Sequence, residues 1–504
     1  MSLDALRGDM VEVQASFNDG LPGIAVVGLP DASVSESKQR VRAALANSGV
    51  TLPARRLTVN LRPADLKKVG TGFDLGIALA ILAADSRVDN ESTSRTVHLA
   101  ELGLDGRLQA VPGVLPAILA AKRKTNKEFM VAPGNLREAQ MVAGVTVRAA
   151  ESLAEAANLH GGEFAVPPLP PADIQPPSAG TTGASLDLRD VAGQEEGRWA
   201  LEVAAAGGHH LLMTGPPGAG KTMLASRLSG ILPDLDEEAA EEVSAIHSVA
   251  GIFDPSSGLM TRPPYQDPHH QSTAVAVIGG GRRVAKPGAA SLAHRGVLFL
   301  DEAPEFDRRV LEGLRQPLES GTLHILRSEG GSVFPARFQL VMAANPCPCG
   351  RGTGKALRCE CTPMQKRRYI SKLSGPLLDR VDLQLELFPV GSAHLHDDSV
   401  GESTAEVARR VRAARARQIA RFAGCAWTTN AEAEIPWLRA HHALSRAATV
   451  DADRTLERGM LSLRGYHRII RVAWTIADLR GVDVPGRDEV LAALLLRQRG
   501  EGME

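Results

Sequence analysis

The stretch LLMTGPPGAGKTMLA, residues 211–225, decides the fold of the central part of the chain. It starts with an apolar run typical of a strand, passes through a glycine-rich turn, and ends as the start of a helix. Gly215, Gly220, Lys221 and Thr222 fit the spacing G-x-x-x-x-G-K-[ST] of a P-loop, a phosphate-binding loop. The alternative is a chance glycine-rich turn, which the acidic motif further along the chain disfavours.

The P-loop pattern predicts an ATP site because each residue type has a task. Glycines let backbone N–H groups turn toward phosphate oxygens, and the helix N-terminus adds the positive end of its dipole. We expect Lys221 to reach the β and γ phosphates and Thr222 to ligate Mg²⁺. The residues expected to bind the nucleotide are Gly215, Pro216, Pro217, Gly218, Ala219, Gly220, Lys221, Thr222 and Met223.

A second motif, GVLFLDEAPEF at residues 296–306, supplies the acidic partners of the P-loop. Val297 to Leu300 is an apolar run, as in a strand buried on both faces, and it ends at two carboxylates. We expect Asp301 to hold Mg²⁺, directly or through water, and Glu302 to orient or deprotonate the attacking water.

The composition is that of a large globular protein without a charge bias. The chain has 504 residues, 44% of them hydrophobic, and a net charge of −1, which suggests about three domains. Any nucleic acid must therefore bind a local basic surface. No apolar run approaches ~20 residues, and the N-terminus carries no signal peptide. Five cysteines, one necessarily unpaired, favour the reducing cytoplasm over a disulfide scaffold.

The order of the segments predicts an α/β protein with four parts. Residues 1–165 read as one α/β domain, with strands at 11–17, 23–29 and 56–61 and helices at 33–49 and 74–84. Residues 166–186 form a Pro/Gly-rich linker, or an ordered loop in their second half. Residues 187–392 hold the P-loop core, and 393–504 are helical. The six arginines within 403–422 are expected to form a solvated helix face.

Four cysteines lie close together in NPCPCGRGTGKALRCECTP, namely Cys347, Cys349, Cys359 and Cys361. Such a group in a reducing compartment suggests a Zn²⁺ site, although C-x-C is tighter than the usual spacing of zinc ligands. Free thiols or a redox-labile pair are the alternatives. Cys425 stands apart and is expected to be a buried apolar residue.

Several longer segments carry a resemblance to a known family. They are GLPDASVSESKQRVRAALANSG (28–49), PHH (268–270), PGAASLAHRGVLFLDE (287–302), VLEGLRQPLESG (310–321), PARFQLVMAANPCPCG (335–350) and LSGPLLDRVDL (373–383). With them, nearly the whole chain is similar to the YifB/ComM family of Mg-chelatase-like AAA+ ATPases. The resemblance implies a Lon-protease-like α/β N-domain, an AAA+ parallel-sheet core and a helical C-terminal lid. It also implies a cytoplasmic hexamer that hydrolyses ATP.

The resemblance also assigns roles around the nucleotide. Asn345, at the end of the strand FQLVMAAN, matches the γ-phosphate sensor of AAA+ proteins; the alternative is a strand-end asparagine starting a turn. Arg380 matches the arginine that reaches the neighbouring subunit's γ-phosphate; the alternative is a surface ion pair with Asp379 or Asp382. Arg464 is the expected second sensor, with Arg468 and Arg471 as rivals.

The N-terminal part resembles the Lon protease catalytic domain in a decayed form. Alignment places Asp74 at the position of Lon's serine nucleophile and Leu115 at the position of its lysine. Since a Ser–Lys pair needs both groups, we expect no peptidase activity. Ser152 and Lys122 are present but in the wrong local context.

Competence members of the family catalyse branch migration of DNA during natural transformation. The resemblance therefore implies branched or single-stranded DNA as a partner. Recombination proteins are further candidate partners. Two loops carry the expected phosphate contacts: an insertion at 262–296 and a hairpin whose strands, 322–326 and 332–338, flank a turn at 329–331. The expected contacts are Arg282, Arg283, Lys286 and Arg327. Gln266 replaces the arginine that usually precedes Pro-His-His.

Three other functions remain open from the sequence. A chelatase motor would help to insert Mg²⁺ into a porphyrin. An ATP-dependent protease or protein remodeller would act on polypeptides. An ATP-gated scaffold would bind nucleotide with little turnover.

Overall fold

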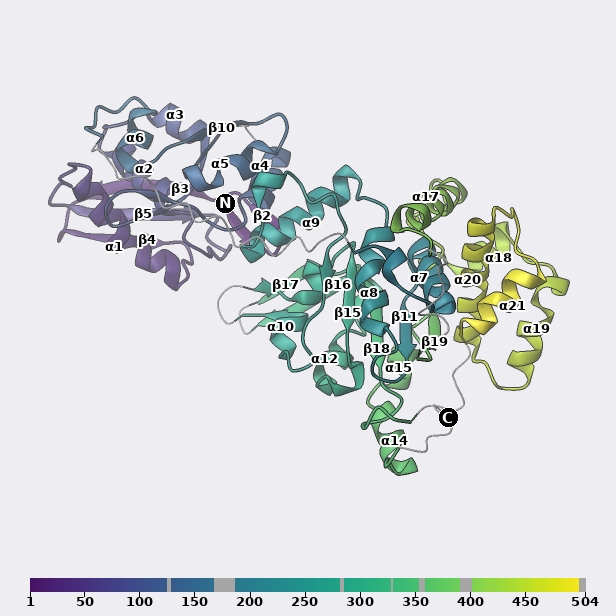
Figure 1. Ribbon diagram of the computed structural model, residues 1–504. Helices are drawn as coiled ribbons and strands as arrows, with labels where there is room; N and C mark the ends of the chain where they lie inside the picture. Colours follow the sequence, from purple (N-terminus) through teal and green to yellow (C-terminus); the bar gives the residue numbers. More distant parts are fainter. Residues whose placement is uncertain are drawn as a thin grey trace.

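The computed structural model describes residues 1–124, 128–166, 186–281, 285–327, 330–352, 359–389 and 401–497. Figure 1 shows an N-terminal unit on one side, a central unit built around a sheet, and helices of the C-terminal part on the other side. The α/β class is confirmed. Within these ranges, every helix is too short or too polar to cross a bilayer.

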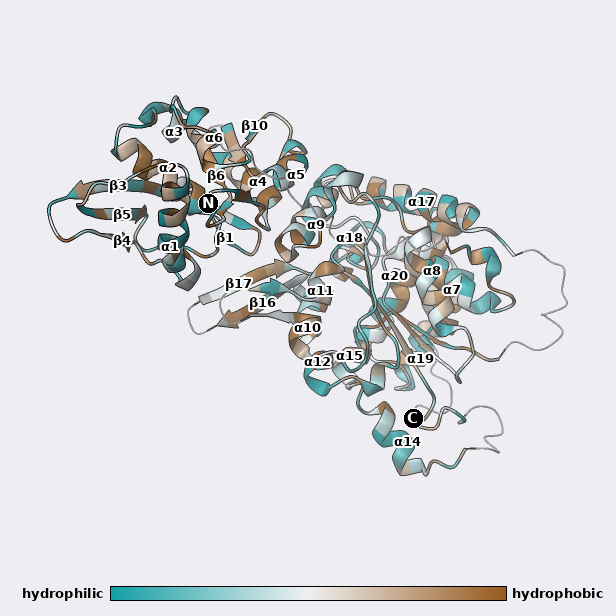
Figure 2. Cartoon of the chain, turned by 60° about the vertical axis from the view of Figure 1, so that its left-hand side comes forward, coloured by the Kyte–Doolittle hydropathy of each residue, from teal (hydrophilic) through white to brown (hydrophobic). Residues whose placement is uncertain are grey.

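The N-terminal unit contains a three-stranded sheet in the order β3-β5-β4. The three predicted strands are confirmed as β3 (Glu12–Asn18), β4 (Gly23–Val27) and β5 (Arg56–Arg62). The two predicted helices are α1 (Ala32–Asn47) and α2 (Asp74–Ala84). Helix α2 is buried along most of its length because DLGIALAILAA offers apolar side chains on every face, visible as a hydrophobic helix in Figure 2.

A second, parallel sheet of the same unit has the order β10-β9-β6. Its strands are β6 (Thr96–Leu99), β9 (Glu128–Val131) and β10 (Thr146–Ala149). The remaining elements of the unit are β1 (Ser2–Asp4), β2 (Arg7–Asp9), α3 (Asn90–Arg95), β7 (Glu101–Leu102), β8 (Leu108–Gln109), α4 (Val114–Lys124), α5 (Leu136–Gln140) and α6 (Leu153–Asn158).

The central unit is built on a five-stranded parallel sheet in the order β12-β15-β18-β11-β19. The strands are β11 (Leu211–Thr214), β12 (Tyr265–Gln266), β15 (Val297–Leu300), β18 (Gln339–Ala344) and β19 (Leu383–Glu386). Strands β11, β15 and β18 are buried throughout, as their unbroken apolar runs predict. Their carboxyl ends therefore meet at one edge of the sheet.

Helices cover both faces of this sheet. On one face lie α7 (Glu195–Gly207) and α8 (Lys221–Ile231), in a hydrophobic cluster that also takes in residues of the C-terminal helices. On the other face lie α11 (Ala289–Leu292), α12 (Arg308–Gly313) and α15 (Gly375–Leu378).

Two β-ribbons project from the central unit toward the N-terminal unit (Figures 1 and 2). One pairs β13 (Gly279–Gly280) with β14 (Lys286–Pro287), just after α10 (Ala274–Ile278). The other pairs β16 (Thr322–Arg327) with β17 (Gly330–Pro335). The predicted hairpin is thus confirmed, but its turn is displaced: Gly330 and Gly331 pair with Arg327 and Leu326 and belong to a strand.

Helix α9 (Glu237–Ala250) joins the central unit to the N-terminal unit by packing on α4. Ser248 on α9 donates a hydrogen bond to the buried carboxylate of Glu138, which also accepts from the backbone N–H of Leu115 at 2.9 Å. Burial raises the pKa of Glu138, while the Ser248 hydroxyl opposes the rise. The contact between the two units is therefore polar as well as apolar.

The described residues 401–497 contain the helices α17 (Thr404–Arg421), α18 (Ile435–His441), α19 (Arg446–Glu457), α20 (Leu463–Arg480) and α21 (Arg487–Leu495). The expectation of a solvated arginine face on α17 holds only in part: Arg409 and Arg412 are exposed, whereas other arginines of the helix bind neighbouring elements. Arg410 contacts Glu202, Arg415 donates to the carbonyl of Ala205 at 2.7 Å, and two further arginines contact Asp478, namely Arg417 and Arg421. These arginines fasten α17 to its neighbours.

Candidate functional site

The P-loop links β11 to α8 at the carboxyl edge of the sheet. Gly218 and Gly220 have φ values of 81° and 85°, which only glycine adopts without strain. A Cβ at Gly215 would lie 2.4 Å from the carbonyl oxygen of Leu387, so this glycine lets the loop pass close to the end of β19. The local sequence thus fits the turn that a phosphate cradle requires.

Lys221 begins α8 and lies inside the loop. Its amino group donates to the carbonyls of Gly215 and Pro216 at 2.6 and 2.9 Å, and to Oδ1 of Asn345 at 3.1 Å. Burial lowers the pKa of Lys221, while the carboxylates of Asp301 and Glu302 oppose this shift. The contact with Asn345 joins the ends of β11 and β18.

Thr222 and Asp301 lie together beside the loop. The Thr222 hydroxyl donates to Oδ2 of Asp301 at 2.7 Å. A hydroxyl and a carboxylate at this separation supply two oxygen ligands of the kind that Mg²⁺ takes in nucleotide sites. The residues present therefore fit the metal that the P-loop pattern implies.

Glu302 occupies a left-handed backbone conformation, with φ of 51°, directly after β15. Its N–H donates to Oδ1 of Asp301 at 2.9 Å, and its side chain is about half exposed. His270 places Nδ1 3.3 Å from Oε2 of Glu302. From the sequence, His269 and His270 are candidate ligands, or more simply substrate-facing or structural residues, because two histidines in a loop carry no signal of the carboxylate they will meet.

Arg380 follows α15. Its guanidinium donates to the carbonyl of Pro376 at 2.5 Å and pairs with Glu319, whereas its Nε is buried without a hydrogen-bond partner among the described residues. The alternative pairing with Asp379 or Asp382 is not what the structure has. Burial lowers the pKa of Arg380, and the charges of three nearby arginines lower it further: Arg315, Arg464 and Arg468.

The three candidate second-sensor arginines on α20 have different surroundings. Arg464 is 72% exposed and lies 3.8 Å from Asp379. Arg468 donates to the carbonyl of Asp379 at 2.7 Å and pairs with Asp382. Arg471 is largely buried, and its Nε lacks a hydrogen-bond partner in the described part of the chain. Only Arg464 therefore has a side chain free to move toward a nucleotide.

The pair of Arg468 and Asp382 is a structural contact. Burial alone would raise the pKa of Asp382, but Arg468 and His209 hold it well below its ordinary value, so the carboxylate is charged.

We expect Arg468→Ala to cost about 3 kcal/mol in unfolding free energy, because it leaves a buried charge unpaired. Urea unfolding of the full chain measures this. Arg464→Ala is the control on the same helix, expected within ~1 kcal/mol of the unaltered chain; an equal loss in both variants would contradict the assignment.

The four cysteines predicted to form a metal site lie close to one another. The Sγ atoms of Cys347 and Cys349 lie 3.3 Å apart, and each lies 3.7 Å from that of Cys359. All four Sγ atoms, including that of Cys361, lie within 4.8 Å of one another. Such a set could hold a metal ion. Cys425 is partly buried against aromatic residues of the C-terminal helices, as expected.

The predicted DNA contacts are only partly within the described residues. Lys286 is exposed on β14. Arg327 ends β16, but its side chain lies outside the description, as do Arg282 and Arg283 altogether. The two ribbons that carry these positions pack together through Ala285, Ile325 and Phe334.

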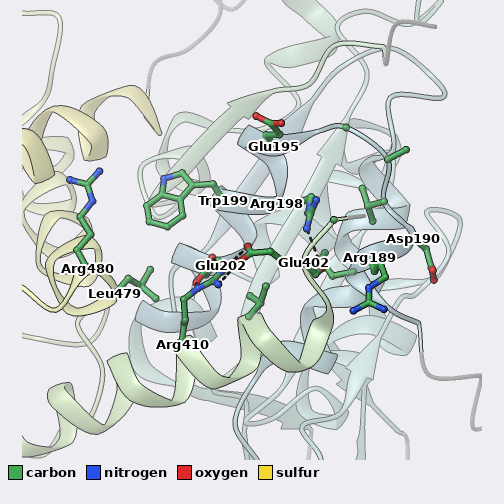
Figure 3. A pocket seen from close by; sticks show the side chains of 16 residues that line it. Arg189, Asp190, Glu195, Arg198, Trp199, Glu202, Glu402, Arg410, Leu479 and Arg480 are labelled. Atoms are coloured by element: carbon green, nitrogen blue, oxygen red, sulfur yellow. Dashed lines mark hydrogen bonds and ion pairs between the residues drawn. The ribbon is translucent and has the colours of Figure 1, made fainter. Parts of the chain in front are cut away.

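A cavity of about 790 Å³ is drawn in Figure 3. Helix α7, the start of α17 and residues 188–193 line it. Inside, Arg410 donates to carboxylate oxygens of Glu202 at 2.6 Å and of Glu402 at 2.5 Å. These charges are paired, and none of the predicted catalytic residues lines the cavity.

The Lon-like positions of the N-terminal unit hold no serine–lysine pair. Asp74 is buried and bonds the guanidinium of Arg40 at 2.6 Å, an ion pair between α1 and α2. Leu115 is buried in the core. Ser152 caps α6 by accepting from the N–H of Glu155 at 3.2 Å, and Lys122 is exposed at the end of α4.

Family models match three stretches of the chain. "Magnesium chelatase, subunit ChlI" matches residues 187–395, "Subunit ChlI of Mg-chelatase" matches 11–135, and "Magnesium chelatase, subunit ChlI C-terminal" matches 401–497. Together they span the P-loop, the N-terminal unit and the C-terminal helices.

Three similar proteins match almost end to end. An uncharacterized protein of Mycobacterium tuberculosis strain H37Rv is 48% identical over 99% of this chain and 98% of its own. Uncharacterized protein YifB of Escherichia coli K12 is 41% identical over 97% of this chain and 94% of its own. Competence protein ComM of Haemophilus influenzae is 42% identical over 94% of this chain and 92% of its own. Lon protease 2 of Bacillus subtilis matches 32% of this chain at 36% identity.

Proposed function

This chain belongs to the YifB/ComM family of Mg-chelatase-like proteins, and from that premise we propose that it is a DNA branch-migration motor driven by ATP. The family supports the coarser statement directly: the chain is an AAA+-type ATPase with a Lon-like α/β unit and a helical C-terminal part. DNA as substrate and a hexameric ring are the proposal.

The observation that carries the proposal is the meeting of four side chains at the ends of three adjacent strands. Lys221 and Thr222 follow β11, Asp301 follows β15, and Asn345 follows β18. In the proposed mechanism Lys221 holds the β and γ phosphates, while Thr222 and Asp301 hold Mg²⁺. Asn345 contacts the γ-phosphate, and Glu302 aligns the attacking water. Mg²⁺ held there would neutralise charge on the phosphates.

A neighbouring copy of the chain would complete the site. Arg380 does not contact the P-loop among the described residues; it lies among like charges that favour an anion in their midst. We propose that it reaches the γ-phosphate bound by the next subunit of a ring, where it would stabilise the transition state. Arg464 would act as the second sensor, since its side chain is exposed.

The two packed ribbons are the proposed DNA contacts. They pack together through Ala285, Ile325 and Phe334. In the sequence, Arg282 and Arg283 follow β13, Lys286 begins β14 and Arg327 ends β16. Lys286, Arg327, Arg282 and Arg283 would contact phosphates and carry little sequence information. The near end-to-end similarity to a competence protein supports DNA as the substrate.

A branch-migration assay tests the function. The full chain with ATP and Mg²⁺ is expected to resolve a four-way DNA junction into two duplexes. Glu302→Gln is the matched variant: it should bind ATP and DNA but lower turnover and branch movement by about 10²-fold or more, because the attacking water loses its base. ATP hydrolysis without any DNA movement would leave the ATPase standing and reject the DNA motor.

Salt dependence tests the proposed phosphate contact of Lys286. The slope of log affinity for DNA against log salt concentration is expected to flatten by about 0.7 to 0.9 in Lys286→Ala, as for one lost phosphate contact. Lys122→Ala, an exposed lysine on the N-terminal unit, should leave the slope unchanged. Equal slopes in all three proteins would remove Lys286 from the interface.

We also propose that the N-terminal unit has no peptidase activity, because Asp74 and Leu115 serve its core. Casein is expected to stay intact with the chain and ATP.

The second candidate function is a chelatase motor, favoured by the descriptions of all three matching family models, each of which names magnesium chelatase. ATP-dependent Mg²⁺ insertion into a porphyrin, with chelatase partner subunits added, would support it.

A further inference from the structure

The four cysteines after β18 form a built site that the motor mechanism does not use. A tetrahedral ion with Zn–S bonds of about 2.3 Å requires sulfurs about 3.8 Å apart. Two of the measured Sγ–Sγ distances are 3.7 Å and a third is 3.3 Å, so the thiols already approach this arrangement. Soft thiolates with no other donor type are the ligand set that zinc prefers among common cellular metals.

The chain around the cysteines is shaped to hold them. The N–H of Gly350 donates to the carbonyl of Cys347 at 3.0 Å, closing a turn that brings Cys349 back toward Cys347. Gly350 has φ of 73°, which suits glycine. A Cβ at Gly352 would lie 3.0 Å from Sγ of Cys347, so the backbone passes close to the sulfurs.

The first two cysteines are attached to the ATP site. Cys347 is fully buried and stands two residues after Asn345, whose side chain accepts from Lys221. On the other side, a Cβ at Gly350 would lie 2.8 Å from both Cδ and Cγ of Pro217 in the P-loop. The turn therefore touches the P-loop and continues the strand that ends in the sensor.

The other two cysteines, Cys359 and Cys361, directly precede α14 (Pro363–Ile370) in the chain. Thr362 follows Cys361 and caps this helix, accepting from the N–H of Gln365 at 3.2 Å while its own N–H donates to Oε1 of Gln365 at 2.8 Å. Tyr369, near the end of this helix, is buried. One ion would join both attachments.

We propose that Cys347, Cys349, Cys359 and Cys361 bind one structural Zn²⁺, which clamps the P-loop and Asn345 against α14 and so holds the ATP site in its working geometry. The metal would have no role in hydrolysis itself. The claim that zinc holds the ATP site in shape rests on the proposed ATPase function. The claim that the four cysteines bind zinc does not.

Metal content tests the site without nucleotide. The full chain, purified without added metal, is expected to contain about one zinc per chain by plasma mass spectrometry. The double variant Cys349→Ser, Cys361→Ser should lose it, and both positions are exposed or half-buried, so folding is spared. Cys425→Ser is the matched control and should keep the zinc. Zinc-free wild type in which all five thiols titrate, bound iron in place of zinc, or full zinc in the double variant would each overturn the site.

Turnover tests the clamp. Removing zinc from the full chain is expected to lower ATP turnover by about 10²-fold, since small misplacements of catalytic groups cost that much, and added Zn²⁺ should restore it. Gly350→Ala is expected to lower turnover, because its Cβ would displace Pro217. Unchanged turnover in the zinc-free chain would overturn the clamp. Zinc in the wild type without any ATP hydrolysis would instead reject the proposed motor and leave the metal site intact.

Discussion

Replacing Arg380 by alanine is expected to lower ATP turnover by about 10³-fold or more while leaving ATP binding nearly unchanged, as for an arginine that acts from the neighbouring subunit. The physical reason is that its charge is needed only in the transition state, when negative charge spreads over the transferred phosphoryl group. Steady-state turnover and equilibrium binding of a fluorescent ATP analogue, measured on one preparation, separate the two effects.

The control for Arg380 is a surface arginine. Arg308 is 84% exposed and pairs with Glu312 one helical turn away, so Arg308→Ala should change neither turnover nor binding. If Arg380→Ala lost ATP binding and turnover equally, Arg380 would act in its own chain's site. If it lost neither, its partner would be Glu319 alone and the shared site would be wrong.

Lys221→Ala is the second large effect. Here both binding and turnover are expected to fall, turnover by about 10²-fold or more, because the lysine contacts phosphate oxygens in the ground state and in the transition state. The variant also removes the hydrogen bond to Asn345, so the ends of β11 and β18 lose a contact. Calorimetric titration with ATP and a phosphate-release assay measure the two effects.

Lys122→Ala serves as the matched lysine variant, since the Lys122 side chain is exposed at the end of α4, in the N-terminal unit. It should bind and hydrolyse ATP as the unaltered chain does. A Lys221→Ala protein that still hydrolysed ATP at a normal rate would reject the P-loop as the site of chemistry.

Much of the nucleotide site could be predicted because its residues sit in local patterns. The P-loop and the Asp301–Glu302 motif each combine an apolar strand with polar residues at its end, and parallel strands bring such ends together. The contact of Lys221 with Asn345 joins residues 124 positions apart, yet it follows from the same rule. Local sequence and strand direction sufficed for this part.

Other contacts could not be predicted, because nothing local specifies them. The contact of His270 with Glu302 and the pairing of Arg468 with Asp382 depend on how loops and helices pack over the sheet. The arginines of α17 looked like a solvent-exposed face, since charge spacing alone does not reveal buried carboxylates on α7 and α20. The approach of Gly350 to Pro217 was likewise invisible without coordinates.

In the proposed motor, two copies of the chain build each ATP site together. Co-assembly of Lys221→Ala chains with Arg380→Ala chains, each tagged separately and each inactive alone, tests it most directly. At equal amounts, roughly one site in four would pair an intact P-loop with an intact neighbouring arginine. We predict that ATP turnover reappears in the mixed assembly. A mixed assembly that stays as inactive as its parents would contradict the claim.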